Sequence, residues 1–120
     1  MITHIGTVAV YVADQDEALR FWTDQVGFEL KDARQMTESV RWLEVGPAGA
    51  DSALVLYPKA LMDDWDARKP SVVFVVDDID ATYRQMVRNG VSFSQDLVDM
   101  AWGKFAAFVD TDGNEFGLRT

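Results

Sequence analysis

The sequence predicts an α+β fold made of two tandem βαβββ modules in a single domain. A length of 120 residues and a mass of 13.5 kDa fit one domain. A β-branched run at 7–12 returns at 71–76, an offset of 64 residues, and Gly27 and Gly90 repeat at an offset of 63 residues. The repeat assigns residues 1–58 to module one, 59–70 to a connection and 71–120 to module two.

Module one opens with a strand and a helix. Residues 7–12 read Thr-Val-Ala-Val-Tyr-Val, and these β-branched and aromatic types favour a strand. Asp14, with Glu17 three residues later, forms a helix start that resembles a capping box, and Gly27 provides the C-terminal stop. Helical spacing marks one buried face, made of Ala18, Phe21, Leu19, Trp22 and Val26.

Module two repeats this unit. Residues 71–76 read Ser-Val-Val-Phe-Val-Val and lead into an acidic turn at 77–80. Tyr83, Met86 and Val87 then follow at helical spacing, and Asn89-Gly90 ends the helix. The second module is therefore expected to begin with the same strand and helix as the first.

Three short strands are expected after each helix, at 28–33, 39–45 and 53–57 in module one and at 92–95, 104–109 and 115–118 in module two. Turn-forming residues at 46–49 and 112–113 separate the last two strands of each module. Leu61, Met62 and Trp65 predict that the connection packs down as a short helix.

Charge and residue counts exclude several classes of function. Twenty acidic residues against eleven basic ones give a net charge of −9, which opposes a phosphate backbone and predicts no nucleic-acid partner. The absence of cysteine excludes disulfides and thiolate metal sites, and a single histidine, His4, excludes sites that need two. The chain shows neither a membrane-length apolar run nor a signal-peptide pattern, so we expect a cytoplasmic protein without a membrane partner.

Several motifs together resemble a known family. They are the opening at 8–14, the helical segment at 18–22, Val-Gly-Phe at 26–28, and the ending Trp102-Gly103 with Asp-Thr-Asp-Gly-Asn at 110–114. With the duplicated βαβββ unit, they resemble the vicinal oxygen chelate superfamily, which holds glyoxalase I, extradiol dioxygenases, fosfomycin resistance enzymes and bleomycin resistance proteins. Thr111 replaces the proline of the family's usual ending. The resemblance implies two curled sheets around a cleft and a homodimer whose chains complete each other's sites.

The resemblance also gives the positions of metal ligands. Enzymes of the superfamily mostly bind a divalent metal through His or Glu residues on the first and last strands of each module. The matching residues here are Thr7, Val55, Ser71 and Gly117. None is a usual ligand, so we expect no metal and no cofactor. Strand alternation turns His4 away from Thr7, whereas a carboxylate-only site at Glu44 and Glu115 stays open as an alternative.

Inner strand positions outline a mostly apolar cleft with hydroxyl groups. Trp42 and Trp102 are placed to reach its rim, although both also fit packing in the core or at a dimer interface. The acidic residues Glu44, Asp96, Asp99 and Glu115 would attract a cation. The predicted cleft residues are Thr7, Ala9, Tyr11, Trp42, Glu44, Val55, Tyr57, Ser71, Val73, Trp102, Glu115 and Gly117.

Three functions remain open at this point. The first is a metal-free small-molecule-binding protein that resembles bleomycin resistance proteins and takes a planar or cationic ligand. The second is a glyoxalase- or dioxygenase-like enzyme, either metal-dependent or using Tyr11, Tyr57 or Glu44 as acid or base. The third is a structural or regulatory dimer with a vestigial cleft. The first function is favoured because the residues at the expected metal positions are not usual metal ligands.

Overall fold

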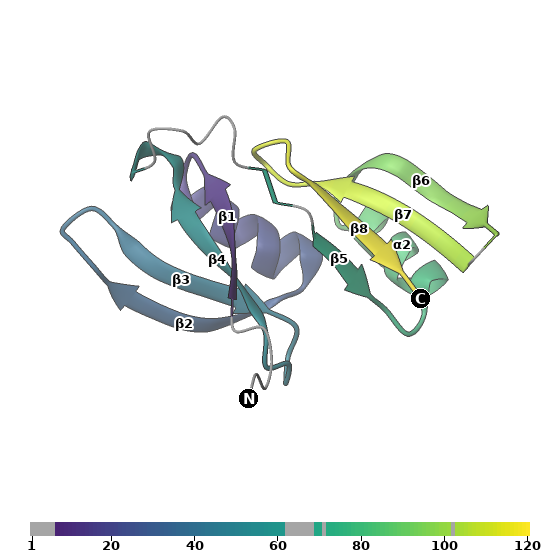
Figure 1. The fold of residues 1–120 in the computed structure, drawn as a ribbon, viewed down its shortest axis with the longest axis horizontal. Helices are drawn as coiled ribbons and strands as arrows, with labels where there is room; N and C mark the ends of the chain where they lie inside the picture. Colours follow the sequence, from purple (N-terminus) through teal and green to yellow (C-terminus); the bar gives the residue numbers. More distant parts are fainter. Residues whose placement is uncertain (1–6, 62–68, 71, 102) are drawn as a thin grey trace. The chain divides into compact units, whose positions relative to one another are not determined.

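The structure is a computed structural model that describes residues 7–61, 69–70, 72–101 and 103–120. The chain forms two compact units, Met1–Pro70 and Ser71–Thr120, and each holds one open four-stranded mixed sheet (Figure 1). The order of elements confirms the predicted α+β fold of two βαβββ modules. Within the described residues, no helix has the length and apolar character that a membrane span requires.

The first unit contains one sheet with the strand order β1-β4-β3-β2. Strand β1 runs parallel to β4, and the other neighbours are antiparallel. Its elements are β1 (Thr7–Val12), the helix α1 (Gln15–Arg20), the π-helix η1 (Phe21–Val26), β2 (Glu29–Gln35), β3 (Arg41–Gly46), β4 (Ala53–Pro58) and the 3₁₀-helix η2 (Lys59–Leu61).

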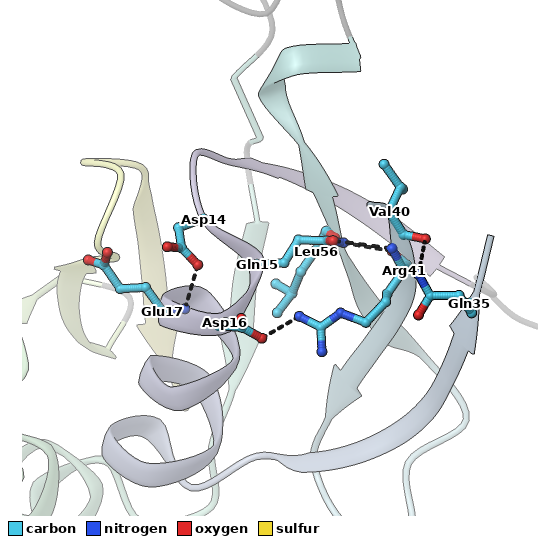
Figure 2. Close-up of polar contacts among 8 residues, drawn as sticks. All are labelled: Asp14, Gln15, Asp16, Glu17, Gln35, Val40, Arg41 and Leu56. Atoms are coloured by element: carbon cyan, nitrogen blue, oxygen red, sulfur yellow. Dashed lines mark hydrogen bonds and ion pairs between the residues drawn. The ribbon is translucent and has the colours of Figure 1, made fainter. Parts of the chain in front are cut away.

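The first helix begins as the sequence predicts and then widens. The Asp14 side chain accepts a hydrogen bond from the Glu17 backbone N–H at 3.1 Å, which satisfies a donor of the first turn (Figure 2). After one and a half turns the α-helix becomes a π-helix. There the Thr23 hydroxyl donates to the Leu19 carbonyl at 2.7 Å, a bond that competes with the backbone ladder. Gly27, with φ +91°, ends the helix as predicted.

One face of the first sheet packs against these helices and forms the core of the unit. Phe21 and Trp22 are buried and lie edge to face, with ring centroids 5.3 Å apart. The buried strand residues that share this core are Val10, Val12, Leu43, Val45, Leu54 and Leu56. The alternate residues of the same strands therefore lie on the face away from the helices.

The second unit has the strand order β5-β8-β7-β6, with β5 parallel to β8. Its elements are β5 (Val72–Val75), the helix α2 (Ile79–Arg88), β6 (Ser92–Met100), β7 (Gly103–Val109) and β8 (Glu115–Arg119). Asp78 caps α2 by accepting a hydrogen bond from the Ala81 backbone N–H at 3.0 Å, as Asp14 does for α1. The repeat therefore extends to the helix caps.

Phenylalanines dominate the core of the second unit. The Phe108 ring stacks near Phe116, with centroids 5.5 Å apart, and near Phe74, at 6.3 Å. Phe93 meets Phe108 at a steeper angle, at 6.1 Å. Phe108 and Phe116 have no exposed surface. This cluster holds β5, β6, β7 and β8 together on the side that α2 covers.

One prediction about the elements was wrong. The strand expected at 92–95 continues to Met100 as β6, an edge strand whose pairing with β7 shifts register twice. Its polar residues broke the strand pattern in the sequence, but an edge strand tolerates them because it is open to solvent. The connection expected at 59–70 begins with a short helix, η2, in which Leu61 is 50% exposed, and Met62 and Trp65 lie outside the described residues.

Candidate functional site

The face of the first sheet that is turned away from the helices carries most of the predicted cleft residues. We call it the open face of the first sheet. Strands β1 and β4 pair Thr7 with Ala53, Ala9 with Val55, and Tyr11 with Tyr57. Residues paired across neighbouring strands lie on the same face, and Val10 and Val12 occupy the opposite one. The alternation expected from the sequence therefore places Thr7, Ala9, Tyr11, Val55 and Tyr57 on the open face.

Two tyrosines form an aromatic pair at one end of this face. The rings of Tyr11 and Tyr57 lie edge to face, with centroids 6.2 Å apart and an angle of 78° between their planes. Both side chains are half-buried. The edge-to-face arrangement fixes the two rings against each other, and each ring presents apolar surface together with a hydroxyl group.

Trp42 and Glu44 of β3 lie on the same open face and bind each other. Glu44 pairs with Val55 of β4, and Trp42 lies two residues before Glu44 on the strand. The Trp42 indole N–H donates a hydrogen bond of 2.6 Å to the Glu44 carboxylate. This bond holds both side chains in place, and it leaves the carboxylate able to accept further hydrogen bonds.

Strand β2 adds a charged pair beside the indole. Its register pairs Asp32 with Glu44 and Arg34 with Trp42. The Arg34 guanidinium lies 5.9 Å from the centre of the Trp42 ring and forms an ion pair of 2.9 Å with Asp32. Because β3 lies between β2 and β4, Arg34 approaches the indole from the β2 side.

Small and aliphatic side chains lie between these groups. The row beside Glu44 continues through Val55 of β4 to Ala9 of β1. Val55 is only 2% exposed, so neighbouring side chains cover it. The side chains of this face that stay partly accessible are the two tyrosines and the Trp42–Glu44 pair.

Three other predicted residues lie on the corresponding face of the second sheet. Val73 of β5 pairs with Gly117 of β8. Glu115 is exposed and lies two residues before Gly117 on β8, so its side chain is on the same face. A Cβ atom on Gly117 would lie 3.1 Å from a ring carbon of Phe105 and 3.2 Å from a methyl group of Val73. A side chain at Gly117 would therefore require small shifts of Phe105 and Val73, and glycine itself offers no group that could bind a metal.

Two acidic residues expected near the cleft turn toward α2 instead. The Tyr83 hydroxyl of α2 donates to Asp96 at 3.0 Å, and this hydrogen bond raises the pKa of the tyrosine. Asp99 pairs across the strands with Lys104, which binds Asp80 of α2 at 2.8 Å. That contact lowers the pKa of Asp80 and raises the pKa of Lys104. Asp96 and Lys104, the partner of Asp99, are therefore engaged with α2 within the second unit.

The residues at the expected metal positions do not fit a divalent metal. Val55 is buried and apolar, Gly117 has no side chain, and Thr7 offers only a hydroxyl group. Among residues 7–61, 69–70, 72–101 and 103–120, no three His, Cys, Asp or Glu side chains gather into a group that could hold a metal ion. His4, Ser71 and Trp102 lie outside the described residues.

Three residues at or beside this site were not predicted from the sequence. Asp32 and Arg34 flank the Trp42–Glu44 pair from β2, and Gln15 binds β3 and β4 from the helix side of the sheet. The sequence did contain a signal for Asp32 and Arg34. They are two residues apart, like Trp42 and Glu44, and the two pairs face each other across a hairpin. Gln15 left no such signal, because its contacts lie 26 and 41 residues away along the chain.

Comparisons with known proteins agree with this fold over nearly the whole chain. A profile of the Glyoxalase/Bleomycin resistance protein/Dioxygenase superfamily matches residues 4–118. The protein YetH of Bacillus subtilis (strain 168) is 49% identical over 119 residues, which cover 99% of each chain.

Solved structures of similar proteins share the same architecture. A superfamily member from Sphaerobacter thermophilus DSM 20745 is 30% identical with a TM-score of 0.85, over 98% of this chain and 97% of that one. TnmS3, an antibiotic binding protein from Streptomyces sp. CB03234, is 33% identical with a TM-score of 0.80, over 98% of this chain and 95% of that one. The chain therefore belongs to the Glyoxalase/Bleomycin resistance protein/Dioxygenase superfamily.

Proposed function

We propose that the protein binds a planar, positively charged small molecule on the open face of the first sheet, without a metal and without transforming it. The observation that carries this proposal is a set of three aromatic residues, Tyr11, Trp42 and Tyr57, on the same face of the sheet as a carboxylate that the indole holds in place. The antibiotic-binding relative TnmS3 supports a binding role for a chain of this fold.

The chemistry of the open face favours a flat cation. Aromatic faces stabilise stacked rings by about 0.5–1.5 kcal/mol and cations by about 0.5–2 kcal/mol. Glu44 adds negative charge next to Trp42, and the net charge of −9 raises the local concentration of cations around the whole protein. Arg34 is paired with Asp32, so its charge is offset by a neighbouring carboxylate.

The residues at the metal positions support binding over catalysis of the glyoxalase or dioxygenase kind. Those reactions use a metal to polarise substrate oxygens or to activate dioxygen. Val55 and Gly117 stand at positions where the ligands of such a metal would be needed, and neither residue has a side-chain group that can coordinate a metal. The open face nevertheless offers hydroxyl groups and a carboxylate that can orient a bound molecule.

The binding proposal can be tested with three flat dyes that differ in charge. We expect the cation proflavine to bind more tightly than neutral acridine, and acridine more tightly than an anilinonaphthalene sulfonate, when each is titrated at mildly alkaline pH. Trp42→Ala and Tyr57→Ala should each weaken proflavine binding by about 3- to 30-fold, the effect of losing one aromatic contact. Isothermal titration calorimetry measures the dissociation constants.

Two controls separate this result from nonspecific association. Met36→Ala removes an exposed apolar side chain from the hairpin of the same sheet, and it should leave proflavine affinity unchanged. Binding should also persist in the presence of a chelator. Equal affinity of the wild type and the Trp42→Ala variant for all three dyes would contradict the proposal, and a strict requirement for a divalent metal would favour an enzyme.

The proposal includes a homodimer. Each sheet ends in two edge strands, β1 and β2 in the first unit and β5 and β6 in the second. Edge strands expose backbone hydrogen-bonding groups, and pairing or cover by a second copy is a common way to satisfy them. We expect sedimentation equilibrium at micromolar concentration to give about twice the mass of one chain, and a single-chain mass across that range would contradict the dimer.

A further inference from the structure

Gln15, the first residue of α1, links the helix to two strands through its side-chain amide. Its Nε2 donates to the Arg41 carbonyl at 2.6 Å and to the Leu56 carbonyl at 2.9 Å. Its Oε1 accepts from the Arg41 backbone N–H at 3.3 Å. Figure 2 shows the amide between β3 and β4, with Asp16 in an ion pair with the Arg41 guanidinium. Two adjacent helix residues therefore hold the start of β3.

The amide of Gln15 stands where the pairing of β3 and β4 is interrupted. These strands pair only at Glu44 with Val55 and at Val45 with Leu54, and they diverge toward the start of β3 (Figure 1). A regular continuation would bring Arg41 opposite Pro58, which has no backbone N–H to donate. A glutamine amide carries both a donor and an acceptor, like a peptide group, and so replaces the missing strand partner.

This interruption falls at two aromatic residues of the open face. In a regular ladder Trp42 would lie directly opposite Tyr57, but the two residues are not paired between β3 and β4. The Gln15 amide instead binds the backbone N–H and carbonyl of Arg41, the residue before Trp42. These bonds fix the backbone directly beside Trp42.

We infer that Gln15 is a positioning residue for Trp42, because it fixes the backbone of Arg41 at the start of β3. The inference rests on the proposed function, because it names the residue that holds one aromatic side chain of the proposed site in place. Gln15 lies on the helix side of the sheet, where it contacts backbone atoms of β3 and β4. It therefore acts through the strands and touches no part of the ligand.

The test compares Gln15→Glu and Gln15→Met with the wild type. A carboxylate cannot donate to the two carbonyl groups, and methionine keeps the length of the side chain without its polar atoms. We expect each variant to weaken proflavine binding by about tenfold. Each variant should also shift the NMR resonance of the Trp42 indole N–H and leave the resonance of the Trp22 indole N–H unchanged. The Trp42→Phe variant identifies the Trp42 resonance. Gln85→Glu is the matched control, since Gln85 is an exposed glutamine of α2, and it should change neither quantity.

Measurements at several pH values distinguish a positioning role of Gln15 from a general loss of stability. In Gln15→Glu the introduced carboxylate faces two carbonyl oxygens, which raise its pKa because they favour the protonated form. On acidification it regains one O–H donor. The Trp42 resonance of Gln15→Glu should therefore return toward the wild-type position as the pH falls from about 7 to about 5, while Gln15→Met shows no such return over the same range.

The outcomes separate the two proposals. If the Trp42 resonance is unchanged in folded Gln15→Met, Gln15 does not position Trp42, whatever the binding result. If the resonance shifts and recovers with pH as expected while the wild type binds no dye, Gln15 positions the strands but the proposed ligand class is wrong. A shift together with about tenfold weaker binding supports both.

Discussion

Phe108→Ala is expected to lower the free energy of unfolding by about 3–5 kcal/mol, the range for removing a fully buried phenylalanine. Phe108 has no exposed surface and contacts the rings of Phe74, Phe93 and Phe116. These residues come from all three other strands of the second sheet, so alanine would leave a cavity among the side chains that join the four strands. Urea unfolding monitored by circular dichroism measures the change.

The matched control is Phe105→Ala, on the same strand but on the opposite face. Phe105 is half-buried and lies over Gly117. Its removal should cost about 1 kcal/mol, because only part of the ring is withdrawn from water in the folded state. Equal losses for the two variants would show that the helix-free side of the second sheet is as tightly packed as the core.

The two-module fold could be predicted because its signals are local and appear twice. The run at 7–12 coincides with β1, and the caps at Asp14 and Asp78 bind the backbone N–H groups three residues on. Those signals depend on neighbours in the sequence. The extent of β6 could not be predicted in the same way, because pairing with β7 maintains it through two register shifts despite its polar residues.

The candidate site was predicted only in part, for the same physical reason. Period-two alternation identified the inward residues of β1 and β4, such as Tyr11 and Tyr57. The direction of Asp96 depended on α2, and the contacts of Gln15 depended on the separation of β3 from β4. Both depend on how distant segments pack, which alternation within one strand does not encode.

Asp110→Ala is expected to lower the free energy of unfolding by about 1–3 kcal/mol. Asp110 is only 7% exposed, in the turn between β7 and β8. Its carboxylate accepts from the backbone N–H groups of Asp112 at 3.0 Å and Asn114 at 2.8 Å, and from the Asn114 side chain at 3.0 Å. Alanine leaves these donors without the acceptor that fixes the turn. Asp77→Ala, an exposed aspartate, should cost less than about 0.5 kcal/mol.

The same residue should give the protein a measurable pH dependence. Burial raises the pKa of Asp110, although its hydrogen bonds from Asn114 and Asp112 act in the opposite direction. The folded state then holds the proton more tightly than the unfolded chain, whose aspartates titrate near pH 3.9. The contribution of Asp110 to stability is therefore largest below that pH and falls as the pH rises through the raised pKa.

Asp110→Asn isolates this contribution because asparagine keeps an acceptor oxygen and cannot ionise, while the Asn114 amide can rotate to accept from it. The free energy of unfolding of the wild type minus that of the variant should decrease as the pH rises from about 3 to about 6. Urea unfolding at a series of pH values measures this difference. An increase over the same range would mean that the turn's hydrogen bonds outweigh burial and that the folded state prefers the charged carboxylate.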